Sequence, residues 1–337
     1  MEFNFKNSLK FLIFLGFGYW LMTLAFKNMD INKMWYEIKN ANFIWILLAM
    51  LCGVLSHVSR ALRWNLLLQP LGYKANKWNA FYSVMIGYFS NNIIPRLGEV
   101  IRCTTLAKSD NIPVEKLFGT VLIERVIDLF VAFLVTIFIF ISQFDILDAF
   151  WKDSIAPRFE TNTGNSVNTN YIIAGALVLL GILIYLLRNK IKNLPFYKKI
   201  AKFAIGFSEG FKSILKLERP ILFIAHSIFI WTMYFAMAYY IFCAYPPTAH
   251  LGYQAGLIVL FLGTVSIIVP IPGAGAGIYH ILVGSGLLLY GVSENDGITY
   301  ATISHAAQVI MVFVIGLLSI AIISYKLRKK IMDKRVL

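Results

Sequence analysis

Two arginines lie inside an apolar stretch at a spacing that places them on one helix face. The segment "SHVSRALRW" carries His57, Arg60 and Arg63 at positions i, i+3 and i+6. A charged side chain within a transmembrane helix costs roughly 3 kcal/mol, so it needs a structural or functional reason. We expect Arg60 to line a polar cavity. Arg63 either joins it or, beside Trp64, anchors the helix at the membrane surface.

Two carboxylates share one face of a later apolar stretch. In "LIERVIDLF", Glu124 and Asp128 are spaced i, i+4, and Arg125 follows Glu124. Such a pair can act as acid and base, hold a cation, relay protons, or form ion pairs. Because buried charges are usually paired, we predict ion pairs with arginines from other segments, and a proton or cation relay is the alternative. The candidate partners are Arg60, Arg96 and Arg102.

Proline and glycine interrupt an apolar region at "GYFSNNIIPRLGEVIRC", residues 87–103. Gly98 is expected to begin a new helix, whose free N–H groups and dipole favour an anion. Arg96 and Arg102 add planar guanidinium groups that suit phosphate, and Glu99 supplies a carboxylate that can orient them. We therefore predict that Arg96, Gly98 and Arg102 bind an anionic group.

A second interruption, "VPIPGAGAG" at residues 269–277, carries no charge. Its glycines allow a ligand to approach the backbone closely, and the helix that follows again begins with N–H groups. We predict Gly273, Gly275 and His280 as ligand contacts. The alternative for the glycines is close packing of small residues between helices.

The charge balance of the candidate residues favours an anionic ligand. Two positive charges are in excess, which suits an anionic headgroup and does not suit a metal cation. The sequence contains no clustered metal-ligand pattern and no G-x-x-x-x-G-K-[ST] motif, so we expect no metal, no cofactor and no ATP-driven step. The positively charged candidates are Arg60, Arg63, Arg96, Arg102 and Arg125, and the negatively charged candidates are Glu99, Glu124 and Asp128.

Transmembrane helices must position these residues. Of the 337 residues, 58% are apolar and 14% are charged, which indicates a polytopic membrane protein. The net charge of +14 is concentrated at residues 188–219 and 326–337, which indicates cytoplasmic segments rather than nucleic-acid binding. The predicted spans are residues 9–26, 43–68, 118–144, 171–187, 221–244 and 300–325.

The distribution of charge predicts the topology. The basic linker 188–219 and the C-terminal tail are expected inside, and the acidic linker 145–170 outside. With the N-terminus inside, region 80–107 must begin and end inside, and region 255–290 must begin and end outside. Each region is therefore a broken helical hairpin, either re-entrant or made of two short crossings.

The two broken regions share a glycine, a serine three residues later, and a Pro-x-x-Gly sequence. This weak similarity indicates an inverted repeat, and interrupted helices in inverted repeats often hold the substrate of a transporter. We predict one all-α membrane domain over residues 1–337. It contains about six full transmembrane helices and two opposed broken hairpins.

The segments "SRALRW", "NNIIPRLGEVIR", "LFGTVLIERVIDL" and "PIPGAGAG", in that order, resemble the flippase-like family, also called the lysylphosphatidylglycerol synthase transmembrane-region family. The resemblance covers nearly the whole chain. It implies a helical protein of the bacterial inner membrane that moves lipids across the bilayer. The positions that match the family's polar motifs are Arg96, Gly98, Glu99, Glu124, Arg125 and Asp128.

In the full-length multiple peptide resistance factor, this membrane region is fused to a soluble synthase domain. The present chain stops after its basic tail. The resemblance therefore does not imply lipid aminoacylation, and we expect no enzymatic activity.

The predicted function is transbilayer movement of an anionic phospholipid or a lipid-linked phosphate compound, with membrane lipids as the partners and both termini cytoplasmic. Arg60, Arg96 and Arg102 are expected to hold the headgroup, and the carboxylates to orient these arginines. One alternative is a secondary transporter of a small soluble anion, in which carboxylates couple protons. Another is a non-transporting partner of a lipid-modifying enzyme.

Overall fold

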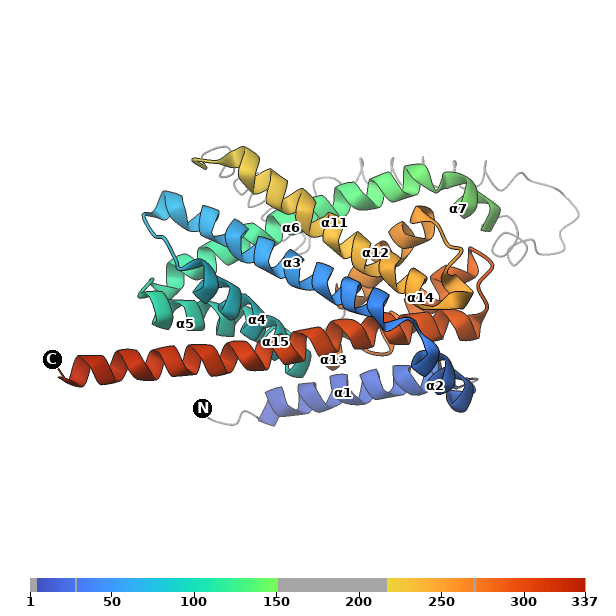
Figure 1. Ribbon diagram of the computed structural model, residues 1–337, viewed down its shortest axis with the longest axis horizontal. Helices are drawn as coiled ribbons and strands as arrows, with labels where there is room; N and C mark the ends of the chain where they lie inside the picture. Colours follow the sequence, from blue (N-terminus) through green and yellow to red (C-terminus); the bar gives the residue numbers. More distant parts are fainter. Residues whose placement is uncertain (1–4, 28, 151–216, 269–270, 337) are drawn as a thin grey trace, which may run out of the picture. The chain divides into compact units, whose positions relative to one another are not determined.

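The computed structural model describes residues 5–27, 29–150, 217–268 and 271–336, which form helices and turns and no strand (Figure 1). The chain divides into two compact units, residues 1–142 with 216–337, and residues 143–215. Of the second unit, the structure describes helix α7 (Phe144–Phe150). The predicted span 171–187 and most of linkers 145–170 and 188–219 lie outside the described residues.

Four described helices are long and apolar enough to cross a membrane, and they match four of the predicted spans. A further helix, α1 (Phe5–Ala25), covers the predicted span 9–26, with a shorter apolar part at Leu15–Ala25. The chain is therefore an all-helical, multi-pass membrane protein. The four long helices are α3 (Phe43–Leu68), α6 (Val114–Ser142), α11 (Pro220–Ala244) and α15 (Glu294–Val336).

A short helix that the sequence analysis missed, α2 (Ile31–Asn40), connects α1 to α3. The carboxylate of Asp30 caps it by accepting from the backbone N–H groups of Asn32 and Lys33, each at 3.0 Å. Ten residues are too few for a span, so the search for apolar stretches did not detect it. Two short 3-10 turns, η1 (Gln69–Leu71) and η3 (Pro246–Thr248), follow α3 and α11.

The first broken region folds as α4 (Lys77–Ile93) and α5 (Gly98–Asp110). The proline after Ile94 cannot continue the helix, and Arg96 turns the chain in the left-handed conformation with φ 67°. The two helices touch at Gly87 and Gly98, where a Cβ on Gly87 would lie 2.9 Å from the carbonyl oxygen of Gly98. Close packing of small residues therefore explains both glycines.

The second broken region comprises α12 (Tyr253–Ile268), the irregular turn α13 (Pro272–Gly275) and α14 (Ile278–Leu288). Gly273 and Ala274 have φ values of 73° and 53°, so α13 does not continue as a regular helix. A Cβ on Gly275, whose φ is 80°, would lie 3.0 Å from the carbonyl oxygen of Ser266. This position requires glycine.

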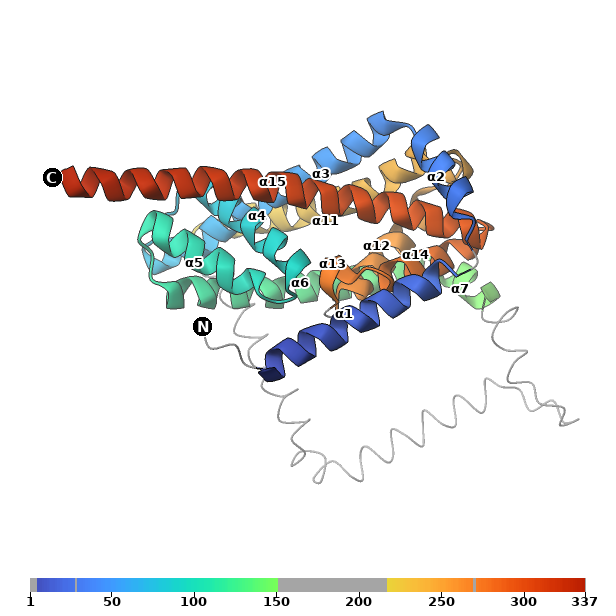
Figure 2. The same cartoon turned by 90° about the horizontal axis from the view of Figure 1, so that it is seen from below.

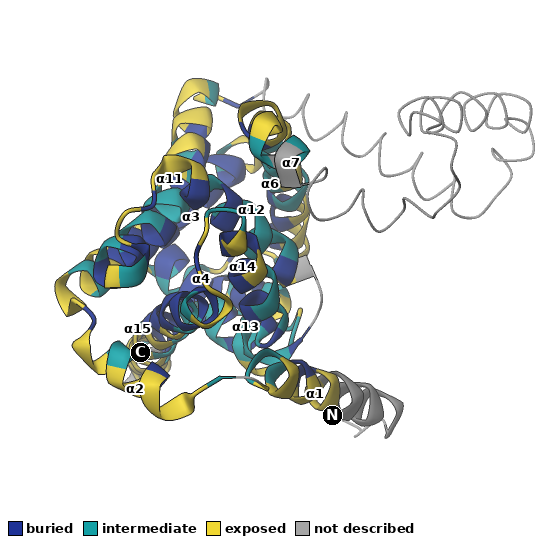
Figure 3. Ribbon diagram, turned by 90° about the vertical axis from the view of Figure 1, so that its right-hand side faces the viewer, coloured by how far each residue is buried: buried dark blue, intermediate teal, exposed yellow. Residues whose placement is uncertain are grey.

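The two hairpins extend toward each other from opposite ends of the helical unit (Figure 2). The turn α13 contacts α4, and α1 contacts α13 and α14. Helix α15 packs against both α14 and α4 and so links the two hairpins. Buried residues lie between these helices, whereas α2 is largely exposed (Figure 3).

Candidate functional site

Three buried arginines converge on two carboxylates of α6. Glu124 Oε1 accepts from Arg60 Nη1 at 2.7 Å and from Arg63 Nη2 at 3.4 Å, while its Oε2 accepts from Arg102 Nη2 at 2.5 Å. Asp128 accepts from Arg60 Nη1 at 2.6 Å and from Arg63 Nη2 at 2.5 Å. We call these five residues the buried ion cluster. It brings together charges from α3, α5 and α6.

The buried ion cluster lies at the middle of α6 and in the C-terminal half of α3. Asp128 is the middle residue of α6. Arg60 lies about 25 Å along α3 from Phe43, at 1.5 Å per residue. Arg63 is fully buried and contacts both carboxylates, so its placement does not support the alternative role of a surface anchor. Ionised groups that are buried between apolar helices need partners, because apolar surroundings cannot solvate them.

Helix α11 completes the cluster with neutral side chains that sequence reasoning missed. Arg60 Nη2 donates to the hydroxyl of Tyr234 at 3.1 Å, and Arg63 Nη1 donates to Ser227 Oγ at 3.0 Å. Neither residue belongs to a charged or interrupted segment, so the search for charges could not find them. The signal available in the sequence was that hydroxyl groups in α11 require hydrogen-bond partners.

A second ion pair lies at the edge of the cluster. Arg125 Nη2 donates to Glu99 Oε1 at 3.0 Å, and the two side chains are 37% and 29% exposed. Arg125 Nη1 also lies 3.9 Å from Asp128 Oδ2. We call Arg125 and Glu99 the rim pair. It connects α5 to α6 beside Asp128.

The first break contributes less than the sequence analysis expected. The N–H of Gly98 donates to Asn91 Oδ1 at 2.7 Å, so this N–H at the start of α5 already has a partner. Arg96 is exposed, and among the described residues neither Glu124 nor Asp128 pairs with it. Of the three predicted arginine partners, the structure brings Arg60 and Arg102 to the carboxylates and leaves Arg96 apart.

The predicted residues of the second break form a separate hydrogen-bonded group. His280 Nδ1 accepts from the N–H of Gly277 at 3.3 Å, and His305 Nε2 lies 3.0 Å from the carbonyl oxygen of Gly273. The two imidazole rings are 5.1 Å apart. These contacts stabilise the turn at α13, and His280 is buried within the bundle.

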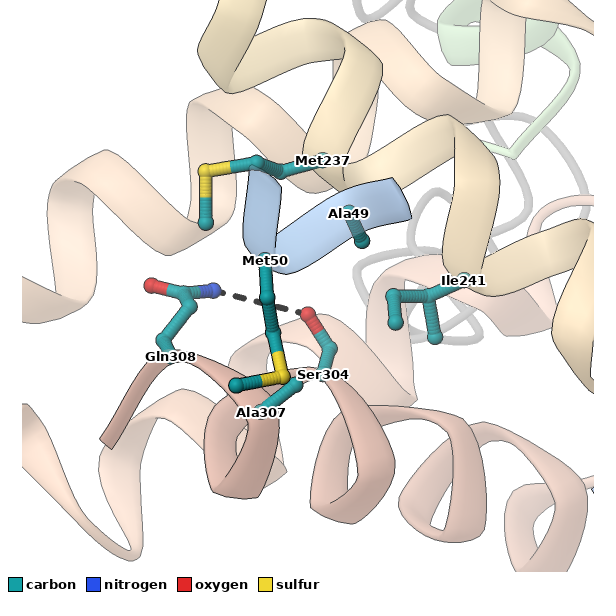
Figure 4. Close-up of a pocket in the computed structure, with 7 residues that line it drawn as sticks. All are labelled: Ala49, Met50, Met237, Ile241, Ser304, Ala307 and Gln308. Atoms are coloured by element: carbon teal, nitrogen blue, oxygen red, sulfur yellow. Dashed lines mark hydrogen bonds between the residues drawn. The ribbon is translucent and has the colours of Figure 1, made fainter. Parts of the chain in front are cut away.

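Two small voids lie among the described helices. The first lies between α3, α11 and α15, where Gln308 and Ser304 face Met50 and Met237 (Figure 4). The second is lined by residues of α4 and α5 together with Arg125. Each measures about 10 Å³, which is roughly the space of one water molecule. Neither void could hold a lipid headgroup in this conformation.

Comparisons with known proteins identify a family whose members are similar to this chain. The profile of the family described as the lysylphosphatidylglycerol synthase TM region matches residues 7–316. A UPF0104 membrane protein of Methanocaldococcus jannaschii is 31% identical over 197 residues, which cover 57% of this chain and 53% of that protein. The matched region thus spans about half the length of this curated relative. No solved structure matches the chain.

Proposed function

The chain belongs to the lysylphosphatidylglycerol synthase TM region family, and from this premise we propose that it moves an anionic phospholipid or a lipid-linked phosphate compound across a membrane. The observation that carries the proposal is the buried ion cluster within long apolar helices. Ionisable residues at such depth are expensive and usually functional. The family name alone does not specify a substrate.

The net charge of the cluster supports an anionic substrate. Three guanidinium groups face two carboxylates, which leaves one positive charge in excess, while the rim pair is neutral. A phosphate group offers several acceptor oxygens to guanidinium groups and would compensate this excess. In the proposed mechanism, Glu124 and Asp128 orient the guanidinium groups of the cluster. Arg96 at the exposed turn makes the first contact with the headgroup.

Passage of a headgroup requires the cluster to open, because the adjoining void measures only about 10 Å³. The rim pair is more exposed than the ion pairs of the cluster, and exposed ion pairs are weak in water. We propose that its separation lets the α4–α5 hairpin move away from α6. The hairpin at α13, which contacts α4, would move with it in an alternating-access cycle or would border a lipid groove.

We further propose about six full spans and two opposed broken hairpins, each re-entrant or made of two short crossings, in a single membrane domain, with both termini cytoplasmic in a bacterial inner membrane. Two lysines of α15 support this orientation. Lys326 Nζ donates to Asn79 Oδ1 at 2.9 Å, and Lys330 Nζ donates to the carbonyl oxygen of Ser109 at 3.1 Å. The basic tail thus lies beside the open end of the first hairpin, and basic ends favour the cytoplasm.

The small volume of the voids favours a second candidate, a non-transporting partner of a lipid-modifying enzyme. Reconstitution into liposomes tests both candidates. Fluorescent anionic lipids should redistribute faster with wild-type protein than in protein-free vesicles. Arg60→Gln and Arg96→Ala should each redistribute these lipids more slowly than wild type. Lys116→Ala, a change at an exposed cation of α6 outside the cluster, serves as the control.

Each outcome of the reconstitution has a defined meaning. If wild type and variants redistribute every lipid at the protein-free rate, the transport proposal fails and the partner role is favoured. If the same vesicles accumulate inorganic phosphate without moving lipid, the protein is instead a transporter of a soluble anion.

A further inference from the structure

Helix α2 presents an apolar face that the protein covers only in part. At about 100° per residue, Ile31, Met34, Trp35 and Ile38 fall within one sector of this helix. Met34 is buried and Ile38 is half-buried, whereas Ile31 and Trp35 are 51% and 56% exposed. The opposite side carries Asn32, Lys33, Tyr36 and Asn40. Within the described part of the chain, Ile31 and Trp35 thus form an apolar stripe that stays largely uncovered.

The contacts of α2 place it at one end of the helical unit. The hydroxyl group of Tyr245 lies 2.7 Å from Glu37 Oε2 and 2.9 Å from Asp296 Oδ1. Helix α2 therefore lies where α11 ends and α15 begins. Figures 2 and 3 show that α2 runs across the direction of α15, which is a candidate membrane span. A helix that lies across a span is close to parallel with the plane of the membrane.

Lipid is the partner that this apolar stripe fits. Helix α2 leads into the candidate span α3, whose first residues, Phe43 and Ile44, are 55% and 69% exposed. Because exposed apolar residues of a span face lipid, the stripe on α2 continues a lipid-facing surface. Lys39 Nζ lies 5.4 Å from the centroid of the Trp35 ring. Tryptophan is enriched at the boundary between membrane and water, and lysine extends its ammonium group toward lipid phosphates.

We propose that α2 is an interfacial helix that binds the lipid surface at its end of the bundle, which the proposed orientation makes extracytoplasmic. Ile31 and Trp35 insert beside the upper part of the acyl chains, and Lys39 lies at the level of the lipid phosphates. Amphipathic helices with this distribution of aromatic, apolar and basic residues lie in the plane of the interface. The inference goes beyond the proposed function, because it concerns how the resting protein contacts the membrane.

Spin labels on single cysteines test this placement in vesicles of phosphatidylglycerol and phosphatidylcholine, in a variant without the native cysteines. Power saturation measures the accessibility of each label to oxygen, which concentrates among acyl chains, and to a water-soluble nickel chelate. Labels at Ile31→Cys and Trp35→Cys should have a severalfold higher ratio of oxygen to nickel accessibility than labels at Lys33→Cys and Asn40→Cys. The two pairs lie on different sides of the same helix, so each pair is the matched control of the other.

Reference labels set the scale of the measurement. Leu122→Cys, at a side chain that is 67% exposed in the candidate span α6, reports the value for lipid, and Lys116→Cys, at the start of α6, reports the value for water. If the cysteine variants fail to fold, brominated lipids replace the spin labels, since they quench the fluorescence of tryptophans that contact lipid. Trp35→Phe should then reduce the fraction quenched by brominated lipid and leave the fraction quenched by aqueous iodide unchanged.

Labels at positions 31 and 35 that favour nickel as strongly as the label at position 40 would overturn the proposal, since α2 would then face water. Labels at positions 31 and 35 that neither reagent reaches would overturn it as well, because another protein surface, such as a second copy of this chain, would then cover the stripe. In the fluorescence measurement, the contrary result is a lipid-quenched fraction that Trp35→Phe does not change. Lipid movement is not measured, so failure of this inference and failure of the proposed function remain distinguishable.

Discussion

At the scale of residues, Glu124 is the centre of the site. It accepts from three guanidinium groups and is fully buried within a candidate membrane span. Its removal would leave the three arginines with one remaining carboxylate of the cluster, Asp128, which contacts only two of them. The residue therefore maintains both the structure of the cluster and the charge that the proposed headgroup would meet.

Glu124→Gln should reduce the free energy of unfolding by roughly 3–5 kcal/mol, because it breaks buried ion pairs from one side. Glu99→Gln removes the carboxylate of the half-exposed rim pair and should cost about 1 kcal/mol or less. Denaturant or thermal unfolding in detergent measures both. Equal losses in the two variants would show that Glu124 is not the centre of the cluster.

Tyr245 gives a prediction that depends on pH. Burial, together with hydrogen bonds to Glu37 and Asp296 at 2.7 and 2.9 Å, raises the pKa of Tyr245 well above its ordinary value of 10.0. The folded protein therefore holds this proton more tightly than the unfolded chain. Its stabilising effect is complete below pH 10.0 and is lost as the pH rises above that value.

The unfolding temperature of Tyr245→Phe should accordingly fall less steeply than that of wild type as the pH rises above 10.0. Tyr253→Phe, at a tyrosine that is 63% exposed, controls for the loss of a phenol. Parallel curves for wild type and Tyr245→Phe would show that the hydroxyl group of Tyr245 is not held by these carboxylates.

The sequence predicted much of the cluster because few charges lie within the spans and they must pair with one another. It predicted that Glu124 and Asp128 pair with arginines, and it included Arg60 and Arg102 among the partners. It did not predict that Arg96 stays outside the cluster, because the left-handed turn after the proline is a matter of local backbone geometry. No motif encodes it.

At the scale of elements, the breaks in α4–α5 and α12–α14 lie where proline and glycine predicted them. Proline lacks a backbone N–H and its ring clashes with the preceding turn, so it ends a helix wherever it occurs in these segments. The position of each break can therefore be predicted from the sequence. Helix α15 was harder to predict, since it continues through the basic tail to Val336. Helix propensity and contacts of its lysines maintain it beyond the apolar stretch.

Gly87 tests the contact between α4 and α5. In Gly87→Ala, the new Cβ would lie 2.9 Å from the carbonyl oxygen of Gly98 and 3.0 Å from Cβ of Arg102, which should cost roughly 1–3 kcal/mol. Gly119→Ala in α6 meets no atom within 4 Å and should be neutral or stabilising. Thermal unfolding compares them, and a Gly87→Ala protein as stable as wild type would contradict the close packing.

At the scale of the whole molecule, the described helices separate basic from acidic ends. Lys326 and Lys330 of α15 contact the start of α4 and the end of α5, whereas Glu37 and Asp296 meet at Tyr245. The positive-inside rule therefore predicts which end faces the cytoplasm. The number of spans stays a prediction, because residues 171–187 lie outside the described part of the chain.

Labelling with an impermeant maleimide tests this orientation in a variant without the native Cys52, Cys103 and Cys243. A cysteine at Asn295, exposed in the first turn of α15, should react in intact cells. A cysteine at Lys116, exposed at the start of α6, should react only after permeabilisation. The reverse pattern would contradict both the orientation and the opposed hairpins.

The central claim, movement of an anionic lipid, is tested most directly by the charge selectivity of the wild-type protein. The measurement is the initial rate of transbilayer redistribution in proteoliposomes for two fluorescent lipids that differ only in headgroup, one anionic and one zwitterionic. The excess positive charge of the buried ion cluster predicts a clearly higher rate for the anionic lipid, above the rate in protein-free vesicles. Equal rates for both lipids, at the protein-free level, would contradict this function.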